Sequence, residues 1–514
     1  MDISNLRKKL TGVGGGFLFA VMALQPPLDV LSYFMNEYGS TLITTALRAV
    51  LLFAVFVYGF IVETERRRYL IFGGVIAGFW LLHTLNCFRL GYQDPLGDLG
   101  EYLKLVQFPL WTLAFTTLLQ SCDGLESHIS GALAVNFCTV LLVIGLSYLT
   151  GSPVYTYDSP SRGVKMGLLG WFSNHNGQSA IVCMLVIGLL LWAYHTRRVW
   201  IFTLASALGF TLLYFTGTRL AYYSAMLTAL GLCFFVLISG GRMRLCCIPL
   251  AAALVLLVLF KGVSIMETRQ TLTGESFQIC QEPTDEIMGE YKDYVYDSGE
   301  IPPEIEERIT RVYEDVYGGL SFAGGTLLGD LLDRFGTERV MKAYNYTTKA
   351  TTLYDGRTKK LKAMELLWEE QDAPTRLLGF ERSNVAIGPN LYGPENDISA
   401  LPYYYGYMGF ALFIGFIGYI FLPIAISCVK NLQGLGSLLT VDFGAWLMLL
   451  VLGLGAGQLS GNVLQNPSAS VYLSLAAAEL CHITKAYGSG RLRARYERRQ
   501  GLTIIQSPVI KGGG

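Results

Sequence analysis

The sequence predicts an all-α polytopic membrane protein with about twelve transmembrane helices and one large extracytoplasmic loop domain. The 514 residues are 52% hydrophobic and only 15% charged, whereas soluble domains carry about 25% charged residues. Apolar segments of helical length recur along most of the chain. One long hydrophilic block, residues 262–400, interrupts them and holds most of the 39 acidic residues.

Composition also excludes several classes of protein. The formal net charge is +0, so no basic surplus is present to meet nucleic-acid phosphates, and we expect no nucleic-acid partner. The ten cysteines are scattered, mostly through apolar segments. Their spacing matches neither a disulfide framework nor a zinc site.

Each predicted span is close to the length that a bilayer requires, about 20 mostly apolar residues. The spans are residues 13–34, 41–62, 69–89, 105–122, 131–149, 176–195, 199–217, 220–239, 246–261, 401–428, 441–459 and 468–486. Arg7–Lys9 and the apolar residues after it resemble a signal peptide, but no small-residue cleavage site follows. We therefore interpret this segment as a retained first helix.

The distribution of Lys and Arg sets the orientation, because these residues accumulate in short cytoplasmic loops. With twelve spans, the basic clusters all fall on one side: Arg7–Lys9, Arg66–Arg68, Arg197–Arg198, Arg242 and Arg244, Lys430, and Arg491–Arg499. Both termini are then cytoplasmic, and the block lies outside. The chain divides into a membrane domain (1–261, spans one to nine), the loop domain (262–400), a second membrane part (401–486, spans ten to twelve) and a basic cytoplasmic tail (487–514).

Within the block, apolar spacing predicts helices over 302–317 and 359–370. No segment of the block shows the alternation of a strand.

Thr218-Arg219 lies on the outer side, at the turn between two spans. Placing an arginine so close to hydrocarbon costs free energy. Such a residue therefore usually either reaches the headgroups or has a function. Snorkelling to the headgroups is the simpler interpretation. The small and polar flanks, Thr216 to Ala221, favour a guanidinium open to an anion, and its planar fork suits a phosphate or pyrophosphate.

Further motifs lie on the same predicted side of the membrane. They are the stretch Gly167–Asn176 ahead of a helix, Gly356-Arg357-Thr358 before a helix that contains Trp368 and ends at Pro374 and Gly379, and Pro394-Glu395-Asn396-Asp397 before a Gly-rich span. In this order, and with Thr218-Arg219, they resemble the O-antigen ligase and O-antigen polymerase family of bacterial envelope glycosyltransferases. The resemblance covers about residues 150–420. Of the two glycines in the family's Gly-x-Gly motif, this sequence has only Gly379.

This resemblance implies a GT-C-like fold and a metal-independent, inverting transfer of a glycan from an undecaprenyl-pyrophosphate carrier. The acceptor would be a hydroxyl of a glycan or lipid outside the plasma (inner) membrane; membrane lipids are the other partners, and no cofactor is implied. Arg219 and Arg357 would offset the charge of the departing pyrophosphate. Glu395 stands where the ligases carry the histidine of a His-Asn pair and would act as the base. The block contains no histidine, which favours a polymerase over a ligase.

Several candidates keep a second interpretation. The predicted substrate-binding residues are Arg48, Arg162, Lys165, Asn176, Asn396 and Asp397. Arg48, inside span two, would pair with Asp29 or with a substrate phosphate. Arg162 and Lys165 could equally be solvated charges. Glu395 could cap the following helix instead of acting as a base, and Asp397 competes with it for either role. His175 is more simply a hydrogen-bonded interface residue than a catalyst.

Other functions remain as alternatives. A peptidoglycan-type polymerase has a similar layout but usually fewer spans. A transporter or flippase of lipid-linked glycans would need polar sites near the bilayer midplane, often in repeated halves, and no internal repeat is evident. A structural scaffold would not explain buried arginines.

Overall fold

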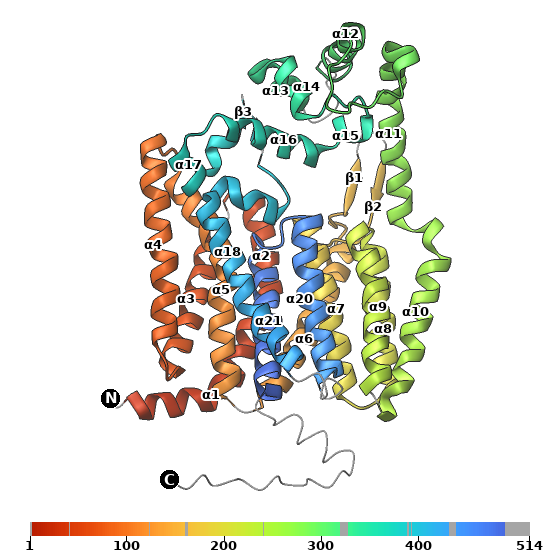
Figure 1. Ribbon diagram of the computed structural model, residues 1–514. Coiled ribbons are helices and arrows are strands. Elements are labelled where there is room, and N and C mark those ends of the chain that lie inside the picture. Colours follow the sequence, from red (N-terminus) through yellow and green to blue (C-terminus); the bar gives the residue numbers. More distant parts are fainter. Residues whose placement is uncertain are drawn as a thin grey trace.

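The computed structural model describes residues 3–40, 42–122, 124–159, 163–239, 241–318, 327–387, 390–391, 393–430 and 438–488. These residues are nearly all helical, and long helices stand side by side in a bundle (Figure 1). The bundle helices are α1 (Ile3–Ala23), α2 (Gln25–Glu37), α3 (Leu42–Val62), α4 (Arg67–Leu90), α5 (Pro95–Ser121), α6 (Leu125–Leu149), α7 (His175–His195), α8 (Val199–Thr216), α9 (Arg219–Ser239), α10 (Cys247–Leu259), α18 (Asp397–Lys430), α20 (Val441–Leu459) and α21 (Pro467–Gly488).

Each of the twelve predicted spans coincides with helix in this bundle, with α1 and α2 together forming the first. Among the described residues, nine helices are long and apolar enough to cross a membrane, and α10 lies in a shorter apolar helix. The chain is therefore a polytopic membrane protein, and the count of about twelve spans stays a prediction. The start of α1 lies at the end of the bundle opposite the polar block (Figure 1).

Helix α7 forms the centre of one half of the bundle. Nearly all its side chains are buried, and it packs against α6, α8, α9 and α20. A helix that is apolar on all faces can be buried in this way without leaving polar side chains unsatisfied. Its first residue, His175, therefore has a fixed place at the end of the bundle that carries the polar block.

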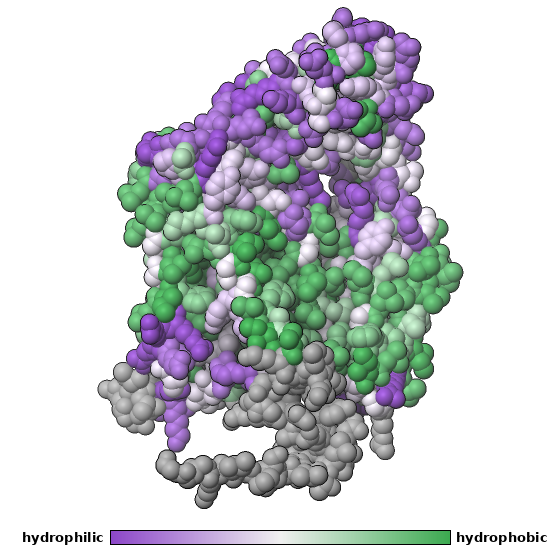
Figure 2. All heavy atoms as spheres, in the orientation of Figure 1, coloured by the Kyte–Doolittle hydropathy of each residue, from purple (hydrophilic) through white to green (hydrophobic). Residues whose placement is uncertain are grey.

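The polar block forms a layer of shorter elements over one end of the bundle (Figure 1). They are α11 (Ile265–Met288), α12 (Pro303–Arg311), the π-helix η5 (Val312–Gly318), α13 (Leu327–Phe335), α14 (Thr337–Ala343), α15 (Ala350–Leu353), α16 (Gly356–Glu369), α17 (Ala373–Leu378), the 3-10 helix η6 (Arg382–Val385), β3 (Ala386–Ile387) and β4 (Asn390–Leu391). Figure 2 shows hydrophilic residues over this layer and an apolar belt across the visible face of the bundle below it. The predicted helix 302–317 corresponds to α12 and η5, and the helix 359–370 corresponds to α16.

Two antiparallel pairs of short strands complete the structure: β1 (Tyr157–Ser159) with β2 (Val164–Met166), and β3 with β4. Tyr157 is opposite Met166 in the first pair. No strand was expected in the polar block. Strands of two residues, as in β3 and β4, are too short to leave an alternating pattern.

Two glycines join the polar block to the bundle, at the end of α17 and at a kink in α18. Gly379 has a φ of +82°, and a Cβ there would lie 2.1 Å from the carbonyl oxygen of Tyr404. Gly406 has a φ of +63°, and a Cβ there would lie 2.3 Å from the carbonyl carbon of Leu377. Both positions require glycine, because a side chain would clash with backbone and left-handed φ angles disfavour other residues. This contact fixes the segment that leads from α16 into α18.

Candidate active site

The turn between α8 and α9 presents Arg219 beside the polar block. Gly217 (φ +79°) lets the turn approach α11, since a Cβ there would lie 2.4 Å from Cγ2 of Ile265. Thr218 fixes the turn: its hydroxyl accepts from the backbone N–H of Ala221 (3.1 Å) and donates to the Ser179 hydroxyl on α7 (3.0 Å). Arg219, the first residue of α9, is exposed. Its cost near the membrane is therefore lowered by access to solvent, and its guanidinium remains open to a ligand.

Arg269, on the first turns of α11, joins Arg219 around Tyr157 of β1. Its guanidinium donates to the Tyr157 hydroxyl, and its Cζ lies 3.8 Å from the centre of the Tyr157 ring. Burial raises the pKa of Tyr157, while the positive charges of Arg269, Arg219 and Arg357 act on its hydroxyl in the opposite direction. Arg269 thus contacts this tyrosine directly, and Arg219 and Arg357 from distant parts of the chain act on it electrostatically. We call Arg219, Arg269 and Arg357 the arginine cluster.

The positive charge of the arginine cluster is only partly compensated by carboxylates. Burial lowers the pKa of Arg269, and the charges of Arg219 and Arg357 lower it further, while Tyr157 opposes this shift. Among the described residues, neither Arg219 nor Arg269 has a carboxylate within ion-pair distance, whereas Arg357 pairs with Glu395. Like charges held this close repel each other unless an anion lies between them. The arrangement is suited to a polyanionic ligand.

Arg357 is placed by the start of α16. Asp355 caps this helix and accepts from the backbone N–H of Thr358 at 2.8 Å. Arg357 follows in the first turn and donates from Nη1 to the carbonyl oxygen of Leu459 at the end of α20 (2.9 Å). The guanidinium is thus held at a helix N-terminus, where the helix dipole adds to the local positive potential.

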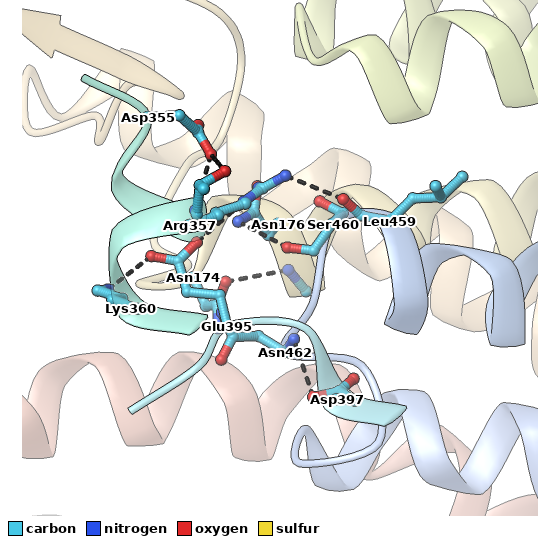
Figure 3. A network of polar contacts seen from close by, with 12 residues as sticks. Asn174, Asn176, Asp355, Arg357, Lys360, Glu395, Asp397, Leu459, Ser460 and Asn462 are labelled. Atoms are coloured by element: carbon cyan, nitrogen blue, oxygen red, sulfur yellow. Dashed lines mark hydrogen bonds and ion pairs between the residues drawn. The ribbon is translucent and has the colours of Figure 1, made fainter. Parts of the chain in front are cut away.

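Glu395 accepts from both neighbouring cations, as Figure 3 shows. Arg357 donates from Nε (3.1 Å) and Lys360 from Nζ (2.7 Å) to its two carboxylate oxygens. Burial by itself would raise the pKa of Glu395, but the hydrogen bonds and charges of Lys360 and Arg357 outweigh it and lower the pKa below its ordinary value. The carboxylate is therefore ionised at neutral pH. Its oxygens accept hydrogen bonds from these two cations, so Glu395 does not cap the following helix in this structure.

Asp397, two residues later, has a different environment. It is 1% exposed, and its carboxylate accepts from the backbone N–H groups of Asn462 (3.1 Å), Val463 (2.7 Å) and Leu464 (2.8 Å). The loop after α20 is thereby tied to the start of α18. Gly461 (φ +76°) completes the contact, because a Cβ there would lie 1.8 Å from the carbonyl oxygen of Glu395. Asp397 thus holds the backbone on which Glu395 sits.

The start of α7 brings a histidine into this site. His175 is the first residue of α7, and its ring lies 6.2 Å from the Tyr157 ring, centre to centre. It interacts electrostatically with Arg269, Glu395 and Arg357. The polar block has no histidine of its own, so the fold supplies an imidazole from elsewhere in the chain.

The asparagines beside His175 also have defined partners. Asn174 caps α7 by accepting from the backbone N–H of Gly177 (3.0 Å), and Asn176 donates to the carbonyl oxygen of Ser460 (3.2 Å). Asn396 lies between Glu395 and Asp397, and its side-chain oxygen is buried with no hydrogen-bond partner among the described residues. Asn176 and Asn396 lie beside the candidate site, and their role in substrate binding stays a prediction.

The other predicted binding residues lie elsewhere. Arg48 pairs with Asp29 at 2.5 Å and lines a separate cavity. Lys165, on β2, is exposed and lies 3.8 Å from Asp158, which matches the solvated-pair interpretation. Arg162 lies outside the described residues.

Sequence reasoning overlooked Arg269, Lys360 and Tyr157 and favoured a structural role for His175. Arg269 lies on a polar helix without strong apolar periodicity, and Tyr157 lies in a three-residue strand. The only signal available was an unexplained charge soon after a membrane span. These residues come together through tertiary contacts, which the spacing of apolar residues in the sequence does not reveal.

A metal could be held at one group among the described residues. His83, Cys87 and Asp98 are buried, with ligand atoms all within 4.8 Å of one another. His83 Nδ1 lies 2.8 Å from the carbonyl oxygen of Leu378, so this group contacts α17 instead of the arginine cluster. The arginine cluster itself is rich in cations and offers little to a metal ion.

A comparison with curated proteins found no match. A comparison with protein families gave a match over residues 337–485, from the start of α14 into α21. This range includes Arg357, Glu395 and Asp397, and it overlaps the predicted resemblance over 337–420; Arg219, Arg269 and His175 lie before it. Residues 337–485 match the family described as O-antigen ligase like membrane protein, which confirms the resemblance over this range and suggests a function in membrane glycan processing.

Proposed function

We propose that the protein is a glycosyltransferase that transfers a glycan from a polyprenyl-pyrophosphate carrier to an acceptor hydroxyl, with polymerisation favoured over ligation. The observation that carries this proposal is the arginine cluster: Arg219, Arg269 and Arg357 act together on Tyr157. A pyrophosphate leaving group develops negative charge as the glycosidic bond breaks. Preorganised cations stabilise that charge without having to reorganise during the reaction.

The arginine cluster can replace the metal that many pyrophosphate-dependent enzymes use. Arginine presents a planar fork of donors that matches phosphate oxygens in a bidentate way. Guanidinium groups from α9, α11 and α16 reach the pyrophosphate from different directions and so fix its position. A metal-independent reaction follows from this proposal, and the His83, Cys87 and Asp98 group takes no part in it.

The acceptor hydroxyl must lose a proton as its oxygen bonds to the anomeric carbon. Glu395 was the predicted base, but its oxygens accept from Lys360 and Arg357, and its lowered pKa makes it a weak base. In our proposal, His175 accepts this proton and Glu395 positions Arg357 and Lys360. The new C–O bond forms at the anomeric carbon while the bond to the pyrophosphate breaks, which inverts the configuration.

The proposed location is the plasma membrane, with the polar block outside and both termini in the cytoplasm. A hydrophilic layer above an apolar belt (Figure 2) suits a carrier whose pyrophosphate lies at the membrane surface and whose polyprenyl chain stays in the bilayer. The polymerase assignment still rests on the polar block, which lacks the histidine expected for a ligase.

The proposal is tested by incubating the purified protein with a synthetic undecaprenyl-pyrophosphate glycan and EDTA, then sizing the products. A ladder of products supports a polymerase, and one shifted band supports a ligase. Absence of any glycosidic product, together with movement of the lipid-linked glycan across vesicles that contain the protein, would replace the proposal with a flippase. Strict dependence on a divalent metal would contradict the role of the arginine cluster.

A further inference from the structure

A polar cavity lies on the other side of the loop that follows α20. It has a volume of about 330 Å³, at the lower end of the range of about 300–1,000 Å³ for ligand pockets. Its walls come from α2, α3, α5, the start of α7 and residues 462–467 before α21. Arg48 lines this cavity, which is why it lies apart from the arginine cluster.

Within the described part of the chain, the cations of the cavity are all paired with carboxylates, unlike Arg219 and Arg269 of the arginine cluster. Arg48 pairs with Asp29 (2.5 Å), while Lys104 (2.7 Å) and Arg382 (3.0 Å) both pair with Glu101. Each of these cations already has a carboxylate partner. A phosphate would have to displace an ion pair to bind here, so the cavity favours a ligand without concentrated negative charge.

Two buried donors in the cavity wall lack a partner among the described residues. They are Nε of Arg48 and Nε2 of Gln178, and Gln178 is only 4% exposed. Buried donors without acceptors are costly, and a ligand that supplies oxygen atoms would satisfy them. Phe172 and Leu52 add apolar surface to the same wall. Oxygen acceptors combined with apolar C–H faces are the chemistry of a saccharide.

The loop after α20 is shared by the cavity and the candidate active site. Asn462 lines the cavity and donates its backbone N–H to Asp397, while Leu459 accepts from Arg357. Glu395 packs on Gly461 within this loop. The loop therefore borders both the cavity and the candidate active site. In an inverting transfer the acceptor oxygen approaches from the side opposite the leaving group.

We propose that this cavity binds the saccharide of the acceptor. The inference rests on the proposed function, since the arginine cluster would hold the pyrophosphate of the donor on the opposite side. Ion-paired and amide side chains would hydrogen-bond the sugar hydroxyls, and Phe172 would contact one sugar face. The acceptor is then recognised through its glycan, whatever carries that glycan.

Gly100 on α5 offers a way to fill the cavity. It lines the cavity, and a Cβ at this position would meet no atom within 4 Å. Gly100→Leu would therefore place a side chain in the space of the ligand, and leucine favours a helix more than glycine does. Gly145→Leu on α6 is the matched control, because Gly145 is exposed, has the same open surroundings and lies outside the cavity lining.

Binding can be measured without any transfer. The probe is the saccharide mixture released by mild acid from the undecaprenyl-linked glycans of the host cells, observed by saturation-transfer NMR with the purified protein. We expect saccharide signals with the wild type, the Gly145→Leu variant and an Arg219→Ala variant, and at least a tenfold weaker affinity with Gly100→Leu. Equal signals with Gly100→Leu, or none with the wild type, would overturn the inference. Saccharide binding by a wild type that forms no glycosidic product would instead refute only the proposed function.

A second variant tests the unpartnered donor. Gln178→Met removes the amide at nearly constant volume, and loss of one hydrogen bond to the ligand should raise the KM for the acceptor about tenfold. The KM for the lipid-linked donor should stay the same. An increase in the donor KM alone would contradict the assignment of the cavity to the acceptor. Inorganic phosphate that abolishes the saccharide signals of the wild type would show that the cavity is an anion site and would also overturn the inference.

Discussion

The two polar regions on either side of the loop after α20 differ in how their cations are paired. In the arginine cluster, Glu395 pairs with Arg357, whereas Arg219 and Arg269 have no carboxylate within ion-pair distance among the described residues. In the cavity, Arg48, Lys104 and Arg382 all have carboxylate partners. Unpaired cations favour a polyanion, whereas paired cations with amide groups favour a neutral, hydroxyl-rich ligand. This difference in charge pairing matches the two ligands of a glycosyl transfer, the pyrophosphate of the donor and the sugar of the acceptor.

The largest effect is expected from removing the charges of the arginine cluster. Changing Arg219, Arg269 or Arg357 to Ala should each lower the transfer rate by at least about 100-fold, the size seen when one preorganised donor is lost. Arg→Lys variants should retain more activity than Arg→Ala variants, because the positive charge remains. They should stay below the wild type, because lysine lacks the planar fork of donors. The measurement is product formation per folded protein.

Arg339→Ala is the matched control, because Arg339 pairs with Glu369 and Glu370 on the polar block and lies outside the site. Its activity should equal that of the wild type. Normal activity in all three cluster variants would remove the basis for the proposed leaving-group site.

A loss of rate of similar size separates the two candidates for the base. His175→Gln should lower the rate by about 100-fold or more, as expected for loss of a general base. Glu395→Gln should have a weaker effect, because its neutral amide still accepts from Arg357 and Lys360. The measurement is the single-turnover rate of both variants and the wild type with saturating donor. A larger loss in Glu395→Gln than in His175→Gln would restore Glu395 as the base.

Asp397 should affect stability more than chemistry. Asp397→Asn replaces a charged acceptor of three backbone N–H groups by a neutral one, and we expect a loss of about 1–3 kcal/mol in the free energy of unfolding. The midpoint of thermal unfolding in detergent reports this change. Ser399→Ala serves as a control on the same helix turn. An unchanged midpoint with lost activity would give Asp397 a direct role in substrate binding instead.

The smallest expected effect is a pH dependence of stability from Glu395. Its pKa lies below the ordinary value of 4.5 in the folded protein, so its ion pairs contribute fully above about pH 4.5 and are lost as the pH falls through the lowered pKa. The stability difference between the wild type and Glu395→Gln should be constant from pH 7 to 5 and should shrink below that. Thermal unfolding of both proteins at several pH values measures it, and a difference that grows on acidification would contradict the ion pairing.

The sequence predicts the bundle well because membrane helices leave a strong local signal. Each predicted span coincides with observed helix, and α16 was expected where it occurs. The sequence also predicts Arg219, Arg357 and Glu395 as site residues, the last two from the resemblance to a family, and their roles stay predictions. The proximity of Arg219 to Arg357 is a tertiary result that no local pattern contains.

The roles of individual polar residues depend on contacts far apart in the chain. Glu395 and Asp397 lie two residues apart in the same motif, and only the contacts of Asp397 with the backbone of Asn462 and its neighbours distinguish this buried anchor from the partly buried ion pair of Glu395. Arg269 was hidden for a related reason, since its partner Tyr157 lies more than a hundred residues earlier. Periodicity reports which face of a helix is buried, and it cannot report which distant side chain the other face meets.

The central claim is that the arginine cluster binds a pyrophosphate without a metal. The most direct measurement is the Kd of the purified protein for undecaprenyl pyrophosphate and for undecaprenyl phosphate in the presence of EDTA. We predict that the wild type binds the pyrophosphate at least about tenfold more tightly than the phosphate, as expected from one additional charge-assisted contact. Each of the variants Arg219→Ala, Arg269→Ala and Arg357→Ala should abolish this preference. Equal affinity of the wild type for the two lipids, or a preference that survives in all three variants, would contradict the claim.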